Sequence, residues 1–160
     1  MGLREFLAGA ALIAASGAAA AAEPVQEPDK VYGVAADDTD MEAAKKRARS
    51  ELPAFYKRLA APAPDEGEFM VKYDLLPGND VEYVWVGALD GSASPMTGTL
   101  LNQPHQGGRN AGDRVSIPEG EIIDWTYRKG AVMQGGYTNR VVLGRMPADE
   151  AAAFRTYLGW

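Results

Sequence analysis

The chain has 160 residues, no cysteine, one histidine and a formal net charge of −6. Without cysteine it forms no disulfide, thiolate nucleophile or thiolate metal site. The acidic balance argues against binding nucleic acid or anionic lipid, because their phosphates demand basic patches.

Residues 1–22 have the pattern of a secretory signal peptide. Arg4 lies in a short n-region, an apolar stretch follows from Phe6, and small residues lead up to Glu23. The apolar stretch is shorter than the roughly 20 residues that span a bilayer. We expect cleavage near residue 22, a periplasmic or secreted protein, and no stable membrane anchor after cleavage. An apolar N-terminal helix of the folded domain is the alternative.

Two regions follow the expected cleavage site. Residues 23–38 are rich in proline and acid, which predicts a flexible arm. Residues 39–160 have a length that suits one domain with one core.

A helix is predicted from residue 39 to residue 59. Apolar residues recur three or four positions apart, as one face of a helix requires, and Thr39 with Glu42 has the spacing of a capping box. Pro53 should kink or restart this helix. The basic run at residues 45–49 is predicted to be a solvated face, with anion binding as the alternative.

Period-two alternation predicts strands in the middle of the chain. Residues 69–75 and 81–86 flank the turn sequence PGND, which predicts a hairpin. Residues 96–104 read as a third strand, residues 105–113 as a glycine-rich loop, and residues 114–118 as a short fourth strand.

The last third of the chain is predicted to contain a strand pair and a helix. Residues 120–130 and 131–144 form the pair, with a helical turn from Thr138 as an alternative within the second segment. Residues 146–158 form a helix with Pro147 in its first turn. The fold class is therefore α+β: a mostly antiparallel sheet packed by an N-terminal and a C-terminal helix.

Several short motifs occur in a familiar order over about residues 40–145. They are M-E-A-A-K-K-R-A-R, F-M-V-K, G-T-L-L-N-Q-P, G-D-R-V, I-I-D-W-T-Y and G-G-Y-T-N-R. This series resembles the bacterial domain-of-unknown-function family 2314, the YegJ-like proteins. The resemblance implies bacterial origin and a small α+β domain, and it implies no reaction. Its signature positions are Asn102, Pro104, Gly112, Asp113, Asp124, Trp125, Gly136, Tyr137, Thr138 and Arg140.

Three residues are candidates for catalysis. His105 lies in the glycine-rich loop, where an imidazole near Asp113 or Asp124 could act as a general base. The alternatives are an exposed loop histidine and an aspartate that caps turn amides. A single histidine without cysteine predicts no metal site, and no cofactor motif is present.

Asp124 is also a structural candidate, because it interrupts an apolar run and a buried carboxylate needs a donor. We expect Arg140 to pair with it, and Trp125 and Gly136 to support the same packing. The alternative leaves Arg140 free to bind an anionic ligand.

The ligand-binding candidates are polar residues near glycines or at the rim of the predicted sheet. They are Asn102, Arg109, Tyr137, Thr138 and Arg140. The glycine-rich loop around Arg109 has neither the phosphate-loop nor the dinucleotide-binding motif, so a flexible connector is the alternative there.

These observations favour a non-catalytic binding or interaction module of the cell envelope. We expect a monomer whose partner is an unknown protein or envelope ligand. The alternatives are a small hydrolase that uses His105, and an immunity-like inhibitor whose acidic surface blocks a basic toxin. The approach of His105 to an aspartate in a concave pocket would favour the enzyme.

Overall fold

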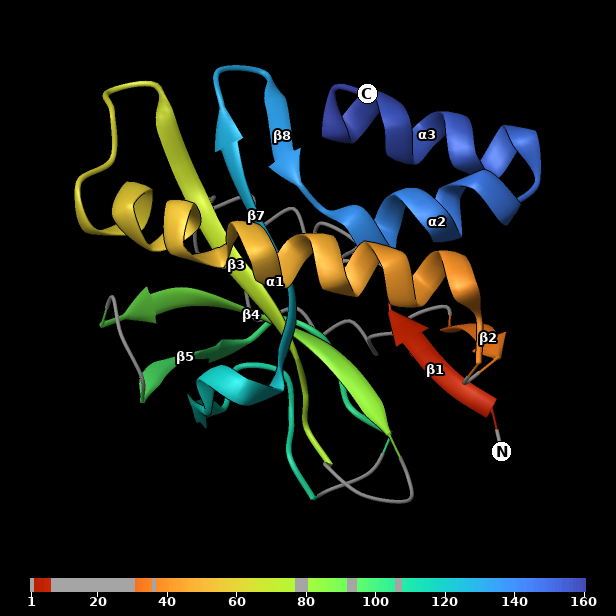
Figure 1. The fold of residues 1–160 in the computed structure, drawn as a ribbon, viewed down its shortest axis with the longest axis horizontal. Helices are drawn as coiled ribbons and strands as arrows, with labels where there is room; N and C mark the ends of the chain where they lie inside the picture. The colour runs from red at the N-terminus through yellow and green to blue at the C-terminus, as the bar shows by residue number, and fades with distance from the viewer. Residues whose placement is uncertain (1, 7–30, 36, 77–80, 92–94, 106–107) are drawn as a thin grey trace, which may run out of the picture.

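A computed structural model describes residues 2–6, 31–35, 37–76, 81–91, 95–105 and 108–160, with side chains from residue 37 onward (Figure 1). Most of the expected signal peptide, the first part of the expected arm and the PGND turn at residues 77–80 lie outside the described residues.

The described strands form one sheet, accompanied by helices from both ends of the chain. The strands are β1 (Gly2–Phe6), β2 (Val31–Ala35), β3 (Glu66–Asp74), β4 (Glu82–Asp90), β5 (Met96–Leu100), β6 (Arg114–Ile117), β7 (Ile122–Lys129) and β8 (Val132–Gly135). The helices are α1 (Thr39–Ala60), the 3-10 helix η1 (Glu119–Glu121), α2 (Tyr137–Arg145) and α3 (Ala148–Leu158).

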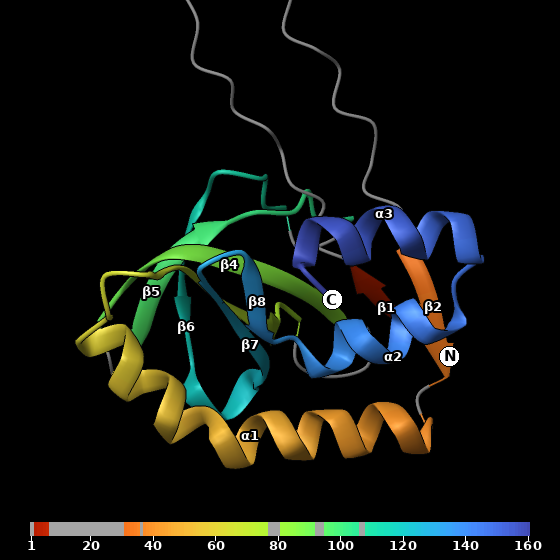
Figure 2. The same ribbon diagram turned by 90° about the horizontal axis from the view of Figure 1, so that it is seen from above.

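The main path of the sheet has the order β2-β1-β4-β3-β7-β8, and β5 and β6 extend from β4. Strands β1 and β4 pair in parallel, and the other described pairs are antiparallel. The predicted α+β class with a mostly antiparallel sheet is confirmed. In Figure 1, α1 lies across the sheet in front of β3 and β7, and Figure 2 shows α2 and α3 side by side at one end.

Helix α1 matches the predicted helix and continues through Pro53 without a break. Its axis bends in the second half (Figure 2), as expected where a proline removes an N–H and crowds the preceding turn. The cap differs from the prediction by one residue. Asp38, rather than Thr39, is the N-cap, and its carboxylate accepts the Met41 N–H at 2.9 Å.

Two groups of buried apolar side chains hold the layers together. The larger one packs α1 against the sheet, and its members include Leu52, Phe55, Val71, Tyr73, Val84, Val86, Ile122 and Trp125. The smaller one joins the start of α1 to β8, α2 and α3, and its members are Met41, Met133, Val142, Leu143, Met146, Ala151 and Leu158. The second group therefore extends the packed core past the part of the sheet that α1 covers, toward α2 and α3.

The predicted strand over residues 131–144 is wrong in its second half. Strand β8 ends at Gly135, and α2 begins at Tyr137, close to the helical alternative from Thr138. Gly135 and Gly136 have φ angles of 74° and 64°, in the left-handed region that favours glycine. This pair of residues turns the chain out of the sheet and into the helix.

The N-terminal region departs from the expected arm where it is described. Residues 31–35 form β2, which pairs with β1. Strand β1 in turn lies beside β4, where Arg4 aligns with Glu82. Because β1 lies within the expected signal peptide, cleavage near residue 22 would remove the strand on which β2 is paired.

Candidate functional site

Asp124 caps helix α2 from a neighbouring strand. The residue at the N-cap position of α2 is Gly136, which has no side chain to bind the first amides. Asp124, on β7, accepts the backbone N–H groups of Thr138 at 2.7 Å and Tyr137 at 3.2 Å. A carboxylate at this end of a helix satisfies unpaired amides and complements the helix dipole. Asp124 thereby fixes the start of α2.

The Asp124 carboxylate is fully buried and lies in a polar cluster with Lys72 and Thr138. The Thr138 hydroxyl donates to Asp124 at 2.7 Å, and Lys72 donates to the same hydroxyl at 3.3 Å. Lys72 and Asp124 are cross-strand neighbours on β3 and β7, and all three residues are inaccessible to solvent. Burial raises the pKa of Asp124, while the hydrogen bonds from Thr138 and the charge of Lys72 oppose that rise.

The predicted Asp124–Arg140 pair does not form. The Arg140 Nε donates to the Gly135 carbonyl at 3.2 Å, and its guanidinium lies 3.6 Å from the centre of the Trp160 ring. Helix α2 is the physical reason. Its first amides take the carboxylate, and Arg140, one turn further along, lies on the exposed side of the helix.

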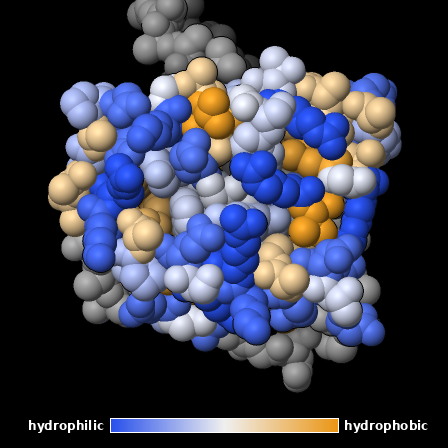
Figure 3. Space-filling model, turned by 45° about the horizontal axis from the view of Figure 1, so that its top comes forward, coloured by the Kyte–Doolittle hydropathy of each residue, from blue (hydrophilic) through white to orange (hydrophobic). Residues whose placement is uncertain are grey.

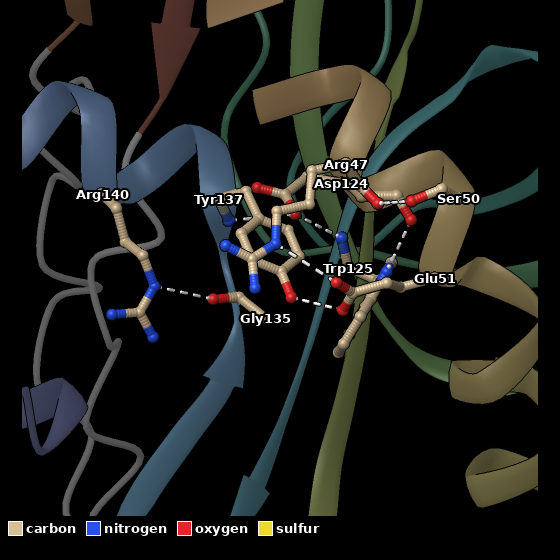
Figure 4. A network of polar contacts seen from close by, with 9 residues as sticks. Arg47, Ser50, Glu51, Asp124, Trp125, Gly135, Tyr137 and Arg140 are labelled. Carbon is tan, nitrogen blue, oxygen red and sulfur yellow. Dashed lines mark hydrogen bonds and ion pairs between the residues drawn. The ribbon is translucent and has the colours of Figure 1, made fainter. Parts of the chain in front are cut away.

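Tyr137 is the centre of a half-buried polar and aromatic group between α1 and α2 (Figure 4). Its hydroxyl donates to Glu51, and the Arg47 guanidinium lies 4.5 Å from the centre of its ring. The ring meets Trp125 edge-on at a centroid distance of 5.9 Å. Burial and the Glu51 contact raise the pKa of Tyr137 to about 12, so the hydroxyl stays neutral at physiological pH.

We call the surface formed by Arg47, Glu51, Tyr137, Arg140 and Trp160 the Tyr137 face. Its two arginines both stack on aromatic rings. Arg47 binds Glu51 at 3.2 Å, whereas no carboxylate pairs with Arg140 among the described residues. Burial lowers the pKa of Arg140, while electrostatic interactions with Tyr137 and Asp124 oppose that effect.

Trp125 packs between the sheet and α1. It is buried, and its indole N–H donates to the Ala48 carbonyl of α1 at 2.9 Å. Trp125 and the neighbouring Asp124 are both buried, because α1 closes over the first and the start of α2 over the second.

The ligand candidate Asn102 lies inside the fold. Its side-chain oxygen accepts the Trp85 N–H at 2.8 Å, which ties the following loop to β4. Thr138 is likewise buried in the Asp124 cluster. Neither side chain is presented to a ligand at the surface.

The catalytic candidates are not assembled around His105. The Asp113 carboxylate accepts the Asn110 N–H at 2.8 Å, which is the turn-capping alternative. Asp124 is buried and occupied by amides. His105 is exposed, and its backbone N–H donates to the buried Glu82 at 2.6 Å.

Four buried charged residues in the described part of the chain were not predicted from the sequence: Lys45, Lys72, Asp74 and Glu82. Lys45 belongs to the run predicted to be solvated, yet it is 4% exposed and donates to the Tyr83 hydroxyl at 3.0 Å. A lysine inside an alternating apolar strand, as in F-M-V-K, was a signal that could have pointed to Lys72.

Within the part of the chain that the structure describes, no three histidine, cysteine, aspartate or glutamate side chains gather to hold a metal ion. No described helix combines the length and the apolar character needed to cross a membrane.

The fold and the site define a small α+β domain in which a buried acid from the sheet caps a helix that carries an exposed arginine. The chain belongs to the family of uncharacterized proteins conserved in bacteria that is designated DUF2314, whose model matches residues 38–160. The match begins at the N-cap of α1 and extends through α3, beyond the resemblance seen in the sequence.

An uncharacterized protein of Escherichia coli strain K12, YegJ, is similar to this chain. The two are 28% identical over 123 residues, which cover 76% of this chain and 79% of that protein. No solved structure matches the chain.

Proposed function

We propose that this protein is an exported, non-catalytic interaction domain. Its partner is a protein segment that carries a carboxylate, and the Tyr137 face binds that segment. The observation that carries the proposal is the exposed Arg140 guanidinium, which is stacked on Trp160 and has no carboxylate partner among the described residues.

Arg140 has the features of an interface anchor. Its Nε is held by the Gly135 carbonyl, which leaves the other two guanidinium nitrogens for a partner. Stacking on Trp160 restricts the side chain, so less conformational entropy is lost when a carboxylate binds. Arginine and aromatic side chains are enriched among residues that dominate binding energy.

Charge, rather than a large apolar surface, supports recognition of this partner. On the side of the molecule drawn in Figure 3, hydrophilic side chains predominate and the hydrophobic areas between them are small and separate. The immunity-like alternative required an acidic surface for a basic toxin, whereas the Tyr137 face presents two arginines.

The hydrolase alternative has less support. A general acid or base must reach its substrate, and both aspartates considered as partners of His105 bind backbone amides instead. Export is supported by Arg4, the apolar stretch and the small residues before Glu23.

Affinity capture from a periplasmic extract of the natural host tests the proposal. The wild-type protein and Arg140→Ala are compared at low and high salt, and the captured proteins are identified by mass spectrometry. Arg155→Ala is the matched control, because Arg155 lies on α3 and donates to the Leu143 carbonyl.

We expect one partner that is retained by the wild type and by Arg155→Ala and lost with Arg140→Ala or high salt. A partner retained equally by all three proteins would show that the Tyr137 face is not the binding surface. Turnover of an envelope substrate that depends on His105 would show that the protein is an enzyme.

A further inference from the structure

A second feature lies away from the Tyr137 face, where β3 ends beside β6 and η1. It is an open hollow of about 350 Å³, which is within the usual size range of small-molecule sites. Its polar lining comes from Tyr73, Asp74, Arg109, Ser116 and Glu121. Leucine, valine and proline side chains complete the wall, so the hollow has charged and aliphatic parts.

The ring of Tyr73 is buried, whereas its hydroxyl lines the hollow. Tyr73 is 4% exposed and packs in the main core, yet no hydrogen bond joins its hydroxyl to another described residue. The hydroxyl oxygen itself is not fully enclosed and meets solvent in the hollow when no ligand is bound. Because Tyr73 lines the hollow, a bound molecule can supply the missing acceptor.

The charged groups of the hollow do not neutralise one another. Among the described residues, no ion pair joins Arg109 to a carboxylate, and Glu121 has no cationic partner. Asp74 uses one oxygen to accept the N–H groups of Leu76 at 3.0 Å and Glu82 at 3.3 Å, which leaves its other oxygen. Burial raises the pKa of Tyr73, with the charges of Arg109 and Asp74 acting on it in opposite directions.

We propose that the hollow binds a small zwitterion, an α-amino acid with an aliphatic side chain. The Arg109 guanidinium and the Tyr73 hydroxyl bind its carboxylate, while Asp74 and Glu121 bind its ammonium group. The side chain lies against the aliphatic wall. A ligand with both charges satisfies both sets of groups at once, whereas a simple anion or cation leaves one set unpaired.

Isothermal titration calorimetry of the purified full chain tests this site, with L-leucine as the probe. N-acetyl-L-leucine lacks the ammonium charge and L-leucinamide lacks the carboxylate. We expect L-leucine to bind, and each blocked form to bind at least about tenfold more weakly, since each loses one charge-assisted contact. L-leucyl-L-leucine distinguishes the source: tighter binding than L-leucine indicates a short peptide, and weaker binding indicates the free amino acid.

Substitutions assign the two ends of the ligand. Arg109→Gln should reduce the difference in affinity between L-leucine and L-leucinamide. Glu121→Gln should reduce the difference between L-leucine and N-acetyl-L-leucine. Tyr73 and Asp74 still hold part of each end. Tyr73→Phe should weaken binding without lowering the melting temperature, because the hydroxyl makes no hydrogen bond to lose. Tyr157→Phe, an exposed tyrosine of α3, is the matched control and should change neither quantity.

The proposal is overturned if L-leucine fails to bind at millimolar concentration, or if the blocked forms bind as tightly as L-leucine. It is independent of the proposed function, because Arg140→Ala should leave L-leucine binding unchanged. Loss of partner capture with intact L-leucine binding would therefore concern the Tyr137 face alone.

Discussion

At the scale of single residues, Asp124 acts as a buried acceptor of backbone N–H groups and not as one half of a surface salt bridge. Its carboxylate accepts hydrogen bonds from Trp125, Tyr137 and Thr138, and the nearest charged contact is Lys72 through the Thr138 hydroxyl. Buried charges are tolerated when every oxygen has a donor. Asp124 therefore links the sheet to the start of the helix that carries the Tyr137 face.

Replacing Asp124 should destabilise the fold far more than replacing Arg140. In Asp124→Asn, the new amide N–H group faces backbone donors and the charge beside Lys72 is lost, so we expect unfolding to become easier by about 2–4 kcal/mol. Arg140→Ala loses a stacking contact at the surface, worth about 1 kcal/mol or less. Urea unfolding of both variants and the double variant measures this.

The two effects should add, because the side chains belong to different contacts. A strong coupling between them would contradict the separate roles described above.

Gly135 is a position where the structure leaves no room for a side chain. With φ at 74°, an added Cβ would lie 2.3 Å from the Trp125 carbonyl oxygen and 2.7 Å from the Trp125 ring. A backbone oxygen cannot move aside without disturbing the β7–β8 pairing.

Gly135→Ala should therefore destabilise the protein by about 2 kcal/mol or more, from the strained φ and the clash together. Gly144→Ala is the matched control in the neighbouring helix. A Cβ there meets open space, so this change should stabilise α2 by roughly 0.5–1 kcal/mol. Thermal unfolding of both variants tests this prediction. Equal melting temperatures would contradict the close approach of Gly135 to the Trp125 carbonyl oxygen.

Some of these residue roles could be predicted from the sequence. An acid within I-I-D-W had to find donors, and Trp125 had to be core. The partner of Asp124 could not be predicted, because the amides that bind it become available only where α2 starts. Lys45 shows the same limit: a basic run on a helix does not reveal which member lies over the Tyr83 side chain.

At the scale of secondary-structure elements, α1 and α2 are joined at their ends. Arg145, in the last turn of α2, binds Asp38 with two nitrogens and Asp40 at 3.0 Å. Asp38 also caps α1. A bidentate pair at a helix terminus thus fixes the angle between the two helices.

This pair predicts a specific dependence of stability on pH. The hydrogen bond from Arg145 lowers the pKa of Asp38 from 3.8 to about 2 in the folded protein. A lowered folded pKa means that Asp38 stabilises the fold above its unfolded pKa and loses that contribution as the pH falls from 3.8 to about 2. Asp38→Asn should accordingly differ most from wild type at neutral pH and converge with it below pH 2.

Guanidinium unfolding at several pH values measures the difference between the two proteins. Arg145→Gln should remove most of the pH dependence that Asp38 contributes. A difference between wild type and Asp38→Asn that stays constant from neutral pH to pH 2 would contradict the pairing.

Elements with a strong period were predictable, whereas α2 was predicted only as an alternative, a helical turn from Thr138. The helical face from Met41 and the alternation in β3 and β4 lie close to their predicted bounds. Helix α2 contains the β-branched pair Val141-Val142 and Gly144, which favour a strand or a break over a helix. Its packing against α1 and α3, together with Met133 of β8, outweighs that local preference.

At the scale of the whole molecule, the N-terminal region raises a question of processing. Strand β1 pairs with β2 and β4, yet it lies in the segment whose composition predicts a cleaved signal. The family match, from residue 38 onward, leaves both strands outside it. If the signal peptide is cleaved, the mature protein lacks β1, and if it is retained, β1 stays in the sheet.

We expect the protein isolated from its natural host to begin near Glu23. Intact-mass spectrometry of the periplasmic fraction reads the N-terminus directly. A chain beginning at residue 1 or 2 in the cytoplasmic fraction would contradict export and would make β1 part of the working fold.

The fold class could be predicted because alternation and helical periods are local properties of the sequence. The hollow could not, because Tyr73, Arg109 and Glu121 come from separate elements that only the folded sheet brings together. The Tyr137 face likewise joins α1 to α2 across the chain. Surfaces of this kind depend on long-range packing that a single sequence does not disclose.

The most direct test of the Tyr137 face is photo-cross-linking in the natural host. p-Benzoyl-L-phenylalanine in place of Gly144 lies one helical turn from Arg140, at a position where added atoms meet open space. The same group in place of Gly120, in η1, is the matched control. We expect a protein adduct from position 144 that Arg140→Ala abolishes, and no such adduct from position 120. The absence of an adduct at position 144, or equal adducts at both positions, would contradict the proposal that the Tyr137 face is the binding surface.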